Sequence, residues 1–270
     1  MIKDITIGQY IPGESFVHKL DPRVKILLSM IYIVDLFIID NFWGYLFILG
    51  FTALSIIISK VPFKYIYKGL KPIFMLLLIT ALLNIFMTGG TSGEPPLWQW
   101  KFLKVYEDGL ILAAFMIIRL VFLIIGTSLL TLTTSPIELT DGLEKLLNPF
   151  KKIGLPAHEI AMMMTIALRF IPTLIDETDK IMKAQMARGA DFESGNILAR
   201  AKNLIPLLVP LFISSFRRAD ELAMAMEARC YKGGSGRTRM KVLKLHNEDY
   251  VAISITAVLV VVSFLSRSFT

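Results

Sequence analysis

The chain has 270 residues, of which 54% are hydrophobic and 19% are charged. That is more apolar surface than one soluble domain of this length buries, so the composition excludes an ordinary soluble protein and indicates an integral membrane protein. The net charge of +7 does not indicate binding to nucleic acid, because cytoplasmic loops rich in Lys and Arg are the first explanation of such a balance in a membrane protein.

Residues that carry chemistry are scarce in this sequence. The single Cys230 and three histidines provide neither an intramolecular disulfide nor a spaced set of metal ligands, so we expect no metal and no cofactor. The sequence also lacks a phosphate-binding loop, paired histidines at metal spacing and a Gly-x-Ser-x-Gly elbow. We therefore expect no catalytic residues, and an intramembrane enzyme has no motif behind it.

Five apolar stretches are predicted to cross the membrane, because a helical span needs about 20 mostly apolar residues. They occupy residues 24–39, 42–59, 70–88, 109–133 and 250–265. The segment 89–96, rich in Gly and Pro, separates the third stretch from the fourth and is predicted to be an outer loop. The predicted fold is therefore an all-α integral membrane protein.

The distribution of basic residues predicts an orientation. On the side of the N-terminus there are 25 basic residues, against 3 on the opposite side, and Arg119 lies inside the fourth stretch. Long loops obey the positive-inside rule weakly, but the shorter loops alone still give 8 against 3. We predict a multi-pass protein of the plasma membrane with its N-terminus in the cytoplasm and its C-terminus outside.

Residues 134–249 form a block of domain length with 17 basic and 14 acidic residues. Such a mixture of charges is not a nucleic-acid-binding arm. We therefore divide the chain into three parts. These are transmembrane helices in residues 1–133, a helical cytoplasmic or interfacial coupling domain with two long coupling helices in residues 134–249, and a transmembrane helix in residues 250–270.

Prolines mark the predicted helix starts within this block. Pro136 and Pro156 follow Ser and Gly-Leu respectively and indicate the first two N-termini. Pro172 and Pro210 are interpreted as heading the two coupling helices. The apolar run 204–216, of about 13 residues, is too short for a span, so we assign it to the membrane surface.

Two charged residues lie inside apolar spans. Asp35 and Arg119 each cost at least about 2.5 to 3.5 kcal/mol at the bilayer centre. One hypothesis is that they form a bond that ties the first span to the fourth. The alternative is that one or both side chains reach the membrane interface.

The pattern Ala-x-x-Ala-Arg followed by a small residue occurs twice. Its members are Ala184, Ala187, Arg188 and Gly189 in the first hexad, and Ala225, Ala228, Arg229 and Cys230 in the second. Alanines three residues apart share a helix face and allow another surface to approach closely. A guanidinium matches a carboxylate with a fixed fork of donors, so each arginine is predicted to dock in an acidic groove of a partner. For a single hexad, the alternative is an arginine that complements the helix dipole.

Five motifs follow one another along the chain. They are residues 18–25, which include Asp21, Pro22 and Arg23, then residues 132–136, 168–172, 184–189 and 225–231. With these motifs the chain resembles, over nearly its whole length, the transmembrane T component of energy-coupling factor (ECF) transporters, the EcfT or CbiQ-like family.

The resemblance implies a scaffold with no substrate site of its own, in an ATP-driven importer of a vitamin or other micronutrient. Its implied partners are two cytoplasmic ABC-type ATPase subunits, forming a heterodimer, interchangeable substrate-binding membrane S components, and lipid. Arg188 and Arg229 match the arginines at the tips of the family's two coupling helices, one for each ATPase.

The alternative function is a conventional permease or secondary transporter with its own substrate path, in which Asp35 and Arg119 line a binding site. Such a protein is expected to have repeated halves with broken helices near mid-membrane. In this sequence the repeat lies in residues 134–249 instead.

Overall fold

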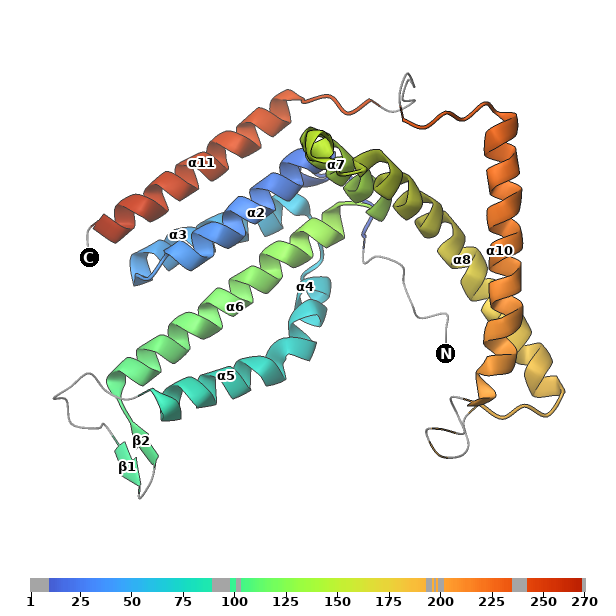
Figure 1. Ribbon diagram of the computed structural model, residues 1–270. Helices are drawn as coiled ribbons and strands as arrows, with labels where there is room; N and C mark the ends of the chain where they lie inside the picture. The colour runs from blue at the N-terminus through green and yellow to red at the C-terminus, as the bar shows by residue number, and fades with distance from the viewer. Residues whose placement is uncertain are drawn as a thin grey trace. The chain divides into compact units, whose positions relative to one another are not determined.

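The computed structural model of the chain describes residues 10–88, 98–100, 103–192, 196, 198, 202–234 and 242–268 (Figure 1). The predicted outer loop 89–96 lies outside these residues.

Helices make up almost all of the described chain. In order they are α1 (Phe16–Lys19), α2 (Pro22–Ile38), α3 (Phe42–Ser59), α4 (Phe63–Leu70), the 3-10 turn η2 (Lys71–Ile73), α5 (Phe74–Met87), α6 (Glu107–Thr133), α7 (Pro136–Leu147), the 3-10 turn η3 (Asn148–Ile153), α8 (Ala157–Ala187), α10 (Ile205–Ala228) and α11 (Asn247–Ser268). A short antiparallel hairpin of β1 (Trp98–Trp100) and β2 (Leu103–Val105) precedes α6. The predicted all-α fold is confirmed.

Five helical segments in the described part of the chain are long and apolar enough to cross a membrane, as predicted. They are Phe42–Ser59, Phe63–Met87, Glu107–Thr133, Ala157–Ala187 and Asn247–Ser266. The set differs from the predicted one in one member. Helix α8 qualifies, with the lowest mean hydropathy of the five at 1.3, whereas α2 has only 17 residues and does not.

The described chain divides into two compact units. One consists of Leu143–Val242, and the other of Gly8–Gly142 together with Leu243–Thr270. The predicted division at residues 133 and 249 concerns the membrane boundary and stays a prediction.

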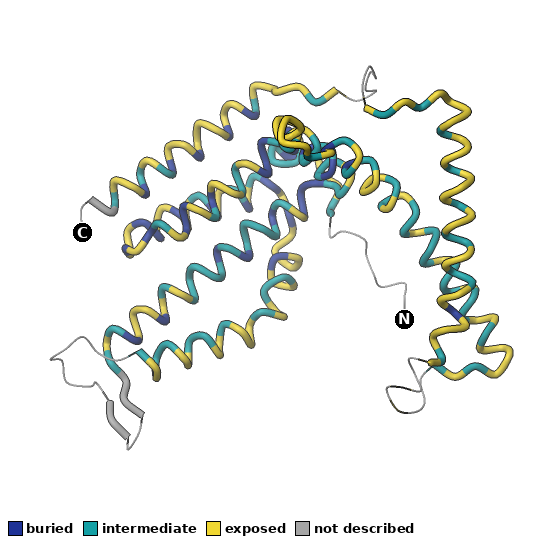
Figure 2. Tube along the Cα trace, in the orientation of Figure 1, coloured by how far each residue is buried: buried dark blue, intermediate teal, exposed yellow. Residues whose placement is uncertain are grey.

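The core of the second unit lies among α2, α3, α6 and α11, where Figure 2 shows most of the buried residues. Two apolar clusters fill it: Tyr32, Leu36, Ile39, Tyr45, Ile48, Phe122 and Leu259 in one, and Ile56, Val61, Ile66, Leu129 and Leu132 in the other. Helix α5 packs beside α6 but contains no buried residue. Its apolar surface is therefore available to lipid or to a partner.

Hydrogen bonds join α11 at both ends to the residues that flank α2. At the start of α11, Asp249 Oδ1 accepts from the Asp21 backbone N–H at 2.8 Å. At the other end, Asn41 Nδ2 donates to the Ser266 carbonyl at 2.6 Å. The chain from Asp21 to Asn41 therefore covers the same distance as α11, which supports the prediction that α2 crosses the membrane with it.

The helix starts agree with the sequence patterns at two prolines and disagree at two others. Helix α7 begins at Pro136, and α8 begins directly after Pro156. Pro172 and Pro210, in contrast, lie inside α8 and α10 and do not head them. A proline in a helix removes one hydrogen bond and favours a kink, but neighbouring turns can carry the helix past it.

The run 204–216 belongs to the N-terminal half of the single 24-residue helix α10. Its assignment to the membrane surface stays a prediction. Its large apolar side chains remain exposed on this helix, among them Val209, Phe212 and Phe216.

Candidate functional site

The two hexads occupy equivalent positions at the C-terminal ends of α8 and α10. In each hexad only the second residue, Gln185 or Met226, is half-buried, and the other five residues are exposed. Both alanines and the arginine of each hexad thus lie at the surface, as a docking role requires.

Helix α8 ends in a Schellman motif that is built on the first hexad. Arg188 is the C-cap residue, and Gly189 follows in the left-handed region with φ 87°. The Gly189 N–H donates to Met186 O at 2.9 Å, and the Ala190 N–H donates to Gln185 O at 3.0 Å. This pair of bonds satisfies carbonyl groups that the helix leaves free at its end.

Helix α10 ends in the same way on the second hexad. Arg229 is the C-cap residue, and Cys230 takes the left-handed conformation with φ 55°. Cys230 N–H donates to Glu227 O at 2.8 Å, and Tyr231 N–H donates to Met226 O at 3.0 Å. The repeat in the sequence is therefore a repeat of local structure, with the arginine at the same position in both.

Neither the Arg188 nor the Arg229 guanidinium has a hydrogen-bond or ion-pair partner among the described residues. Both guanidinium groups are free to bind a carboxylate of another chain. A role in complementing the helix dipole is compatible with these positions but leaves the donors of the guanidinium unused.

The two helix ends that carry the arginines lie at opposite ends of the α8–α10 pair. Helices α8 and α10 pack antiparallel: Gln185 near the end of α8 donates to Pro206 O near the start of α10, at 3.4 Å. Arg188, the C-cap of α8, therefore lies near the start of α10, and Arg229, the C-cap of α10, lies at its far end. Figure 1 shows the two helices crossing. At 1.5 Å per residue, the length of α10 separates the two arginines by about 36 Å.

The motif Asp21-Pro22-Arg23 joins α2 to α11 within the second unit, which consists of Gly8–Gly142 and Leu243–Thr270. Asp21 caps α2 and accepts bonds from the Arg23 backbone at 2.9 Å and from its guanidinium at 2.8 and 3.0 Å. Burial alone would raise the pKa of Asp21, but the hydrogen bonds and charge of Arg23 outweigh it and hold that pKa below its usual value. Asp249 completes the group from α11.

No sequence motif contains Asp249, and Lys25 is only the last residue of the motif 18–25, with no role predicted for it. Asp249 is fully buried, and its Oδ2 also accepts from the His246 N–H at 2.8 Å. Lys25 donates from Nζ to Thr133 O at 2.9 Å, at the C-terminal end of α6, and to His18 O at 3.0 Å. For Asp249, the only signal in the sequence is a charged residue next to an apolar stretch. Such a signal does not identify the partner of the side chain.

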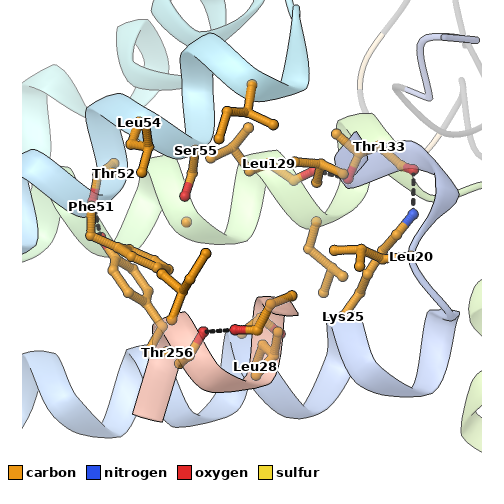
Figure 3. Close-up of a pocket in the computed structure, with 18 of the residues that line it drawn as sticks. Leu20, Lys25, Leu28, Phe51, Thr52, Leu54, Ser55, Leu129, Thr133 and Thr256 are labelled. Atoms are coloured by element: carbon orange, nitrogen blue, oxygen red, sulfur yellow. Dashed lines mark hydrogen bonds between the residues drawn. The ribbon is translucent and has the colours of Figure 1, made fainter. Parts of the chain in front are cut away.

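Lys25 and Thr133 close one end of a cavity of about 160 Å³ (Figure 3). Its walls are mainly apolar and come from α1, α2, α3, α6 and α11. Neither Asp35 nor Arg119 lines it.

The hypothesised bond between Asp35 and Arg119 is not present in the structure, because each side chain has other partners. Asp35 is buried and accepts from Ser263 Oγ of α11 at 2.9 Å. Arg119 donates to Tyr45 Oη at 3.0 Å and to Ile39 O at 2.9 Å.

The environment of Arg119 explains how a guanidinium is accommodated within α6. Its Nη2 lies 3.3 Å from Asp40 Oδ1, and its Cζ lies 5.5 Å from the centre of the Phe37 ring. Together with Asp40 and Asp108, Arg119 lines a second cavity of about 390 Å³. Asp35 is not among the residues of that cavity, so the structure does not bring the two charged residues into one substrate site.

Within the described residues, no group of three or more His, Cys, Asp or Glu side chains could hold a metal ion. Cys230 is exposed and is not part of a disulfide.

Comparison with known proteins gives concordant matches over nearly the full length. Residues 13–241 match the family model CbiQ, described as cobalt transport protein. The chain is 76% identical over 267 residues to the energy-coupling factor transporter transmembrane protein EcfT of Clostridium kluyveri, covering 99% of this chain and 98% of that one. Proteins of the same name from Ruminiclostridium cellulolyticum and Bacillus subtilis are 57% and 50% identical, over 96% and 99% of this chain and 95% and 100% of their own lengths.

Proposed function

We propose, because this chain belongs to the family of energy-coupling factor transporter transmembrane proteins, that it transmits ATP hydrolysis on partner chains to substrate uptake. Family membership and the apolar helices make it a multi-pass membrane component of a transporter. The proposal adds its partners. These are two cytoplasmic ABC-type ATPase subunits, forming a heterodimer, and interchangeable membrane proteins that bind a vitamin or other micronutrient.

The observation that carries this proposal is the pair of matching arginine ends. Arg188 and Arg229 are exposed and cap their helices through the same Schellman geometry, and their guanidinium groups have no partner among the described residues. The two arginines lie at opposite ends of the α8–α10 pair. The simplest arrangement is therefore that each arginine contacts a different partner chain. The slim alanine faces allow each partner to approach the helix closely.

The orientation is part of the same proposal. ATP is in the cytoplasm, so both arginine ends must face it, together with the loop after α3 and the chain between α6 and α11. This places the N-terminus inside and the C-terminus outside, in agreement with the count of basic residues in the loops. The non-catalytic role follows, since ATP is hydrolysed on the partners.

The test is the double variant Arg188→Ala with Arg229→Ala, expressed with the chain's own ATPase and substrate-binding subunits. We expect the ATPase subunits to be lost on purification, because truncation of an interface arginine at a hot spot typically costs at least about 2 kcal/mol, or about 30-fold in affinity. Each single variant should weaken one ATPase contact. Substrate uptake by the double variant should fall with assembly.

Arg217→Ala is the matched control. Arg217 is an exposed arginine of α10, the helix that ends at Arg229, and it lies outside the hexad. It should leave assembly and uptake unchanged. If the double variant assembles and transports like Arg217→Ala, the docking role of the two arginines is wrong.

A further inference from the structure

Helices α8 and α10 are linked by one charged pair at matching positions. Glu177 lies eleven residues before Arg188, and Arg218 lies eleven residues before Arg229. Arg218 Nη2 donates to Glu177 Oε2 at 2.9 Å, and Ser214 Oγ donates to Glu177 Oε1. The two side chains are 22% and 36% exposed, so the pair lies between the helices and is partly shielded from solvent.

Contact between equivalent residues has a geometric meaning. When two similar helices are related by a two-fold axis, only residues near that axis meet their own counterparts. The Glu177–Arg218 contact therefore places a local pseudo-two-fold axis through the crossing point of α8 and α10. From this point each arginine is eleven residues away along its own helix, or about 16 Å at 1.5 Å per residue.

The arms on the two sides of the crossing are therefore equal. A pair of equal arms ending in the same arginine cap presents two similar docking ends in opposite directions. Any change in the crossing angle moves both ends at once and by similar amounts. A bond at the crossing point fixes the length of both arms, so each crossing angle of the two helices sets one separation of the two ends.

We propose that Glu177 and Arg218 are positioning residues that form the pivot of the α8–α10 pair and hold the two arginine ends in register. This inference rests on the proposed docking function of Arg188 and Arg229. Glu177 carries the pivot from α8 as the acceptor of two bonds, and α10 supplies both donors. Loss of the pair lets the helices slide or splay, so that movement at one end no longer reaches the other.

The first test measures the separation of the two ends in the purified full chain, without any partner. Cys230 is the only cysteine and is exposed, so it takes one spin label, and Lys183→Cys near the end of α8 takes the other. Pulsed electron–electron double resonance should give one narrow distribution of the distance between the two labels. Glu177→Gln should broaden it, and the charge exchange Glu177→Arg with Arg218→Glu should narrow it again. An unchanged distribution in Glu177→Gln overturns the proposal.

The matched control is Asp179→Asn. Asp179 lies on the same helix but faces Lys183 of its own helix at 4.0 Å, so it makes no bond to α10. The distance distribution should be unchanged in this variant, measured with the α8 label moved from Lys183 to Met186→Cys. Broadening equal to that of Glu177→Gln would mean that charge on α8 in general sets the geometry, and would also overturn the proposal.

The second test measures function in the assembled complex with native Cys230 and Lys183. Glu177→Gln should keep both ATPase subunits on purification but lower the substrate uptake per ATP hydrolysed at least about fivefold, the lower end of usual coupling factors. The charge exchange should restore uptake. Uncoupling with assembly intact supports the pivot, whereas unchanged coupling overturns it. Failure of the arginine docking itself would show in Arg188→Ala with Arg229→Ala, while the distance measurement would still judge the pivot.

Discussion

At the scale of single residues, Cys230 occupies a backbone conformation that residues other than glycine rarely adopt. Cys230 follows Arg229 with a φ of 55°, and Gly189 follows Arg188 in the same motif with a φ of 87°. The left-handed conformation costs an ordinary residue roughly 1 to 2 kcal/mol, because Cβ approaches the following carbonyl oxygen. The end of α10 is therefore the more strained of the two helix ends.

Exchanging these two residue types should change the stability of each helix end in opposite directions. Cys230→Gly should strengthen the end of α10 by about 1 kcal/mol, and Gly189→Ala should weaken the end of α8 by a similar amount. The space around Gly189 is open, so the added methyl group meets no neighbour and the cost comes from the backbone alone.

Hydrogen exchange of the cap amides measures both effects. The Tyr231 N–H should exchange more slowly in Cys230→Gly, and the Ala190 N–H should exchange faster in Gly189→Ala. Cys230→Ser keeps a Cβ atom and is the control, with no expected change. Equal exchange in Cys230→Gly and Cys230→Ser would show that the cap is not strained.

The residue scale also shows what sequence can and cannot predict. The ends at Arg188 and Arg229 were predictable, because small residues after a helical pattern are local signals. The partners of Arg119 were not: charge led to Asp35, whereas the structure uses the Tyr45 hydroxyl and the Ile39 carbonyl. Backbone carbonyl groups are acceptors at every residue, so no sequence pattern distinguishes the one that will be used.

At the scale of elements, the same limit applies to pairing between helices. Asp249 bonds to Asp21 across 228 residues of chain, and Glu177 bonds to Arg218 across 41. Periodicity shows that a helix has an apolar face, but it does not show which helix covers that face. The passage of α8 and α10 through Pro172 and Pro210 has the same origin, because tertiary packing overrides a local breaker.

Asp249→Asn tests the junction between α2 and α11. The carboxylate accepts two backbone N–H bonds, from Asp21 and His246, whereas an amide would place its own NH₂ group against one of them. Leaving one buried donor unsatisfied costs about 1 to 3 kcal/mol, so the thermal transition of the detergent-solubilised chain should fall.

Glu248→Gln is the control for this junction, since Glu248 lies in the same first turn of α11 but is less buried. It should leave the transition where it is. If Asp249→Asn has the same thermal transition temperature as Glu248→Gln, the two bonds do not stabilise the unit.

At the scale of the whole molecule, the membrane path depends on whether α2 is counted as a span. Length and composition favour α8 over α2. Helix α2, however, packs on α6 and α11, and bonds at both of its ends keep it level with α11. With α2, α3, α4–α5, α6 and α11 as the five spans, the two termini lie on opposite sides of the membrane, as the proposed orientation requires.

Single cysteines in a Cys230→Ser background distinguish this path from its alternatives. A membrane-impermeant maleimide added to intact cells should label Glu107→Cys, at the start of α6, which is predicted to lie outside. It should not label Glu14→Cys before α2 or Lys64→Cys in α4, both of which are exposed but predicted to lie inside. If α8 crossed the membrane and α2 did not, Glu14 and Lys64 would lie on opposite sides of Phe42–Ser59 alone, so one of the two would be labelled. Permeabilised cells, in which all three positions should react, are the control for reactivity.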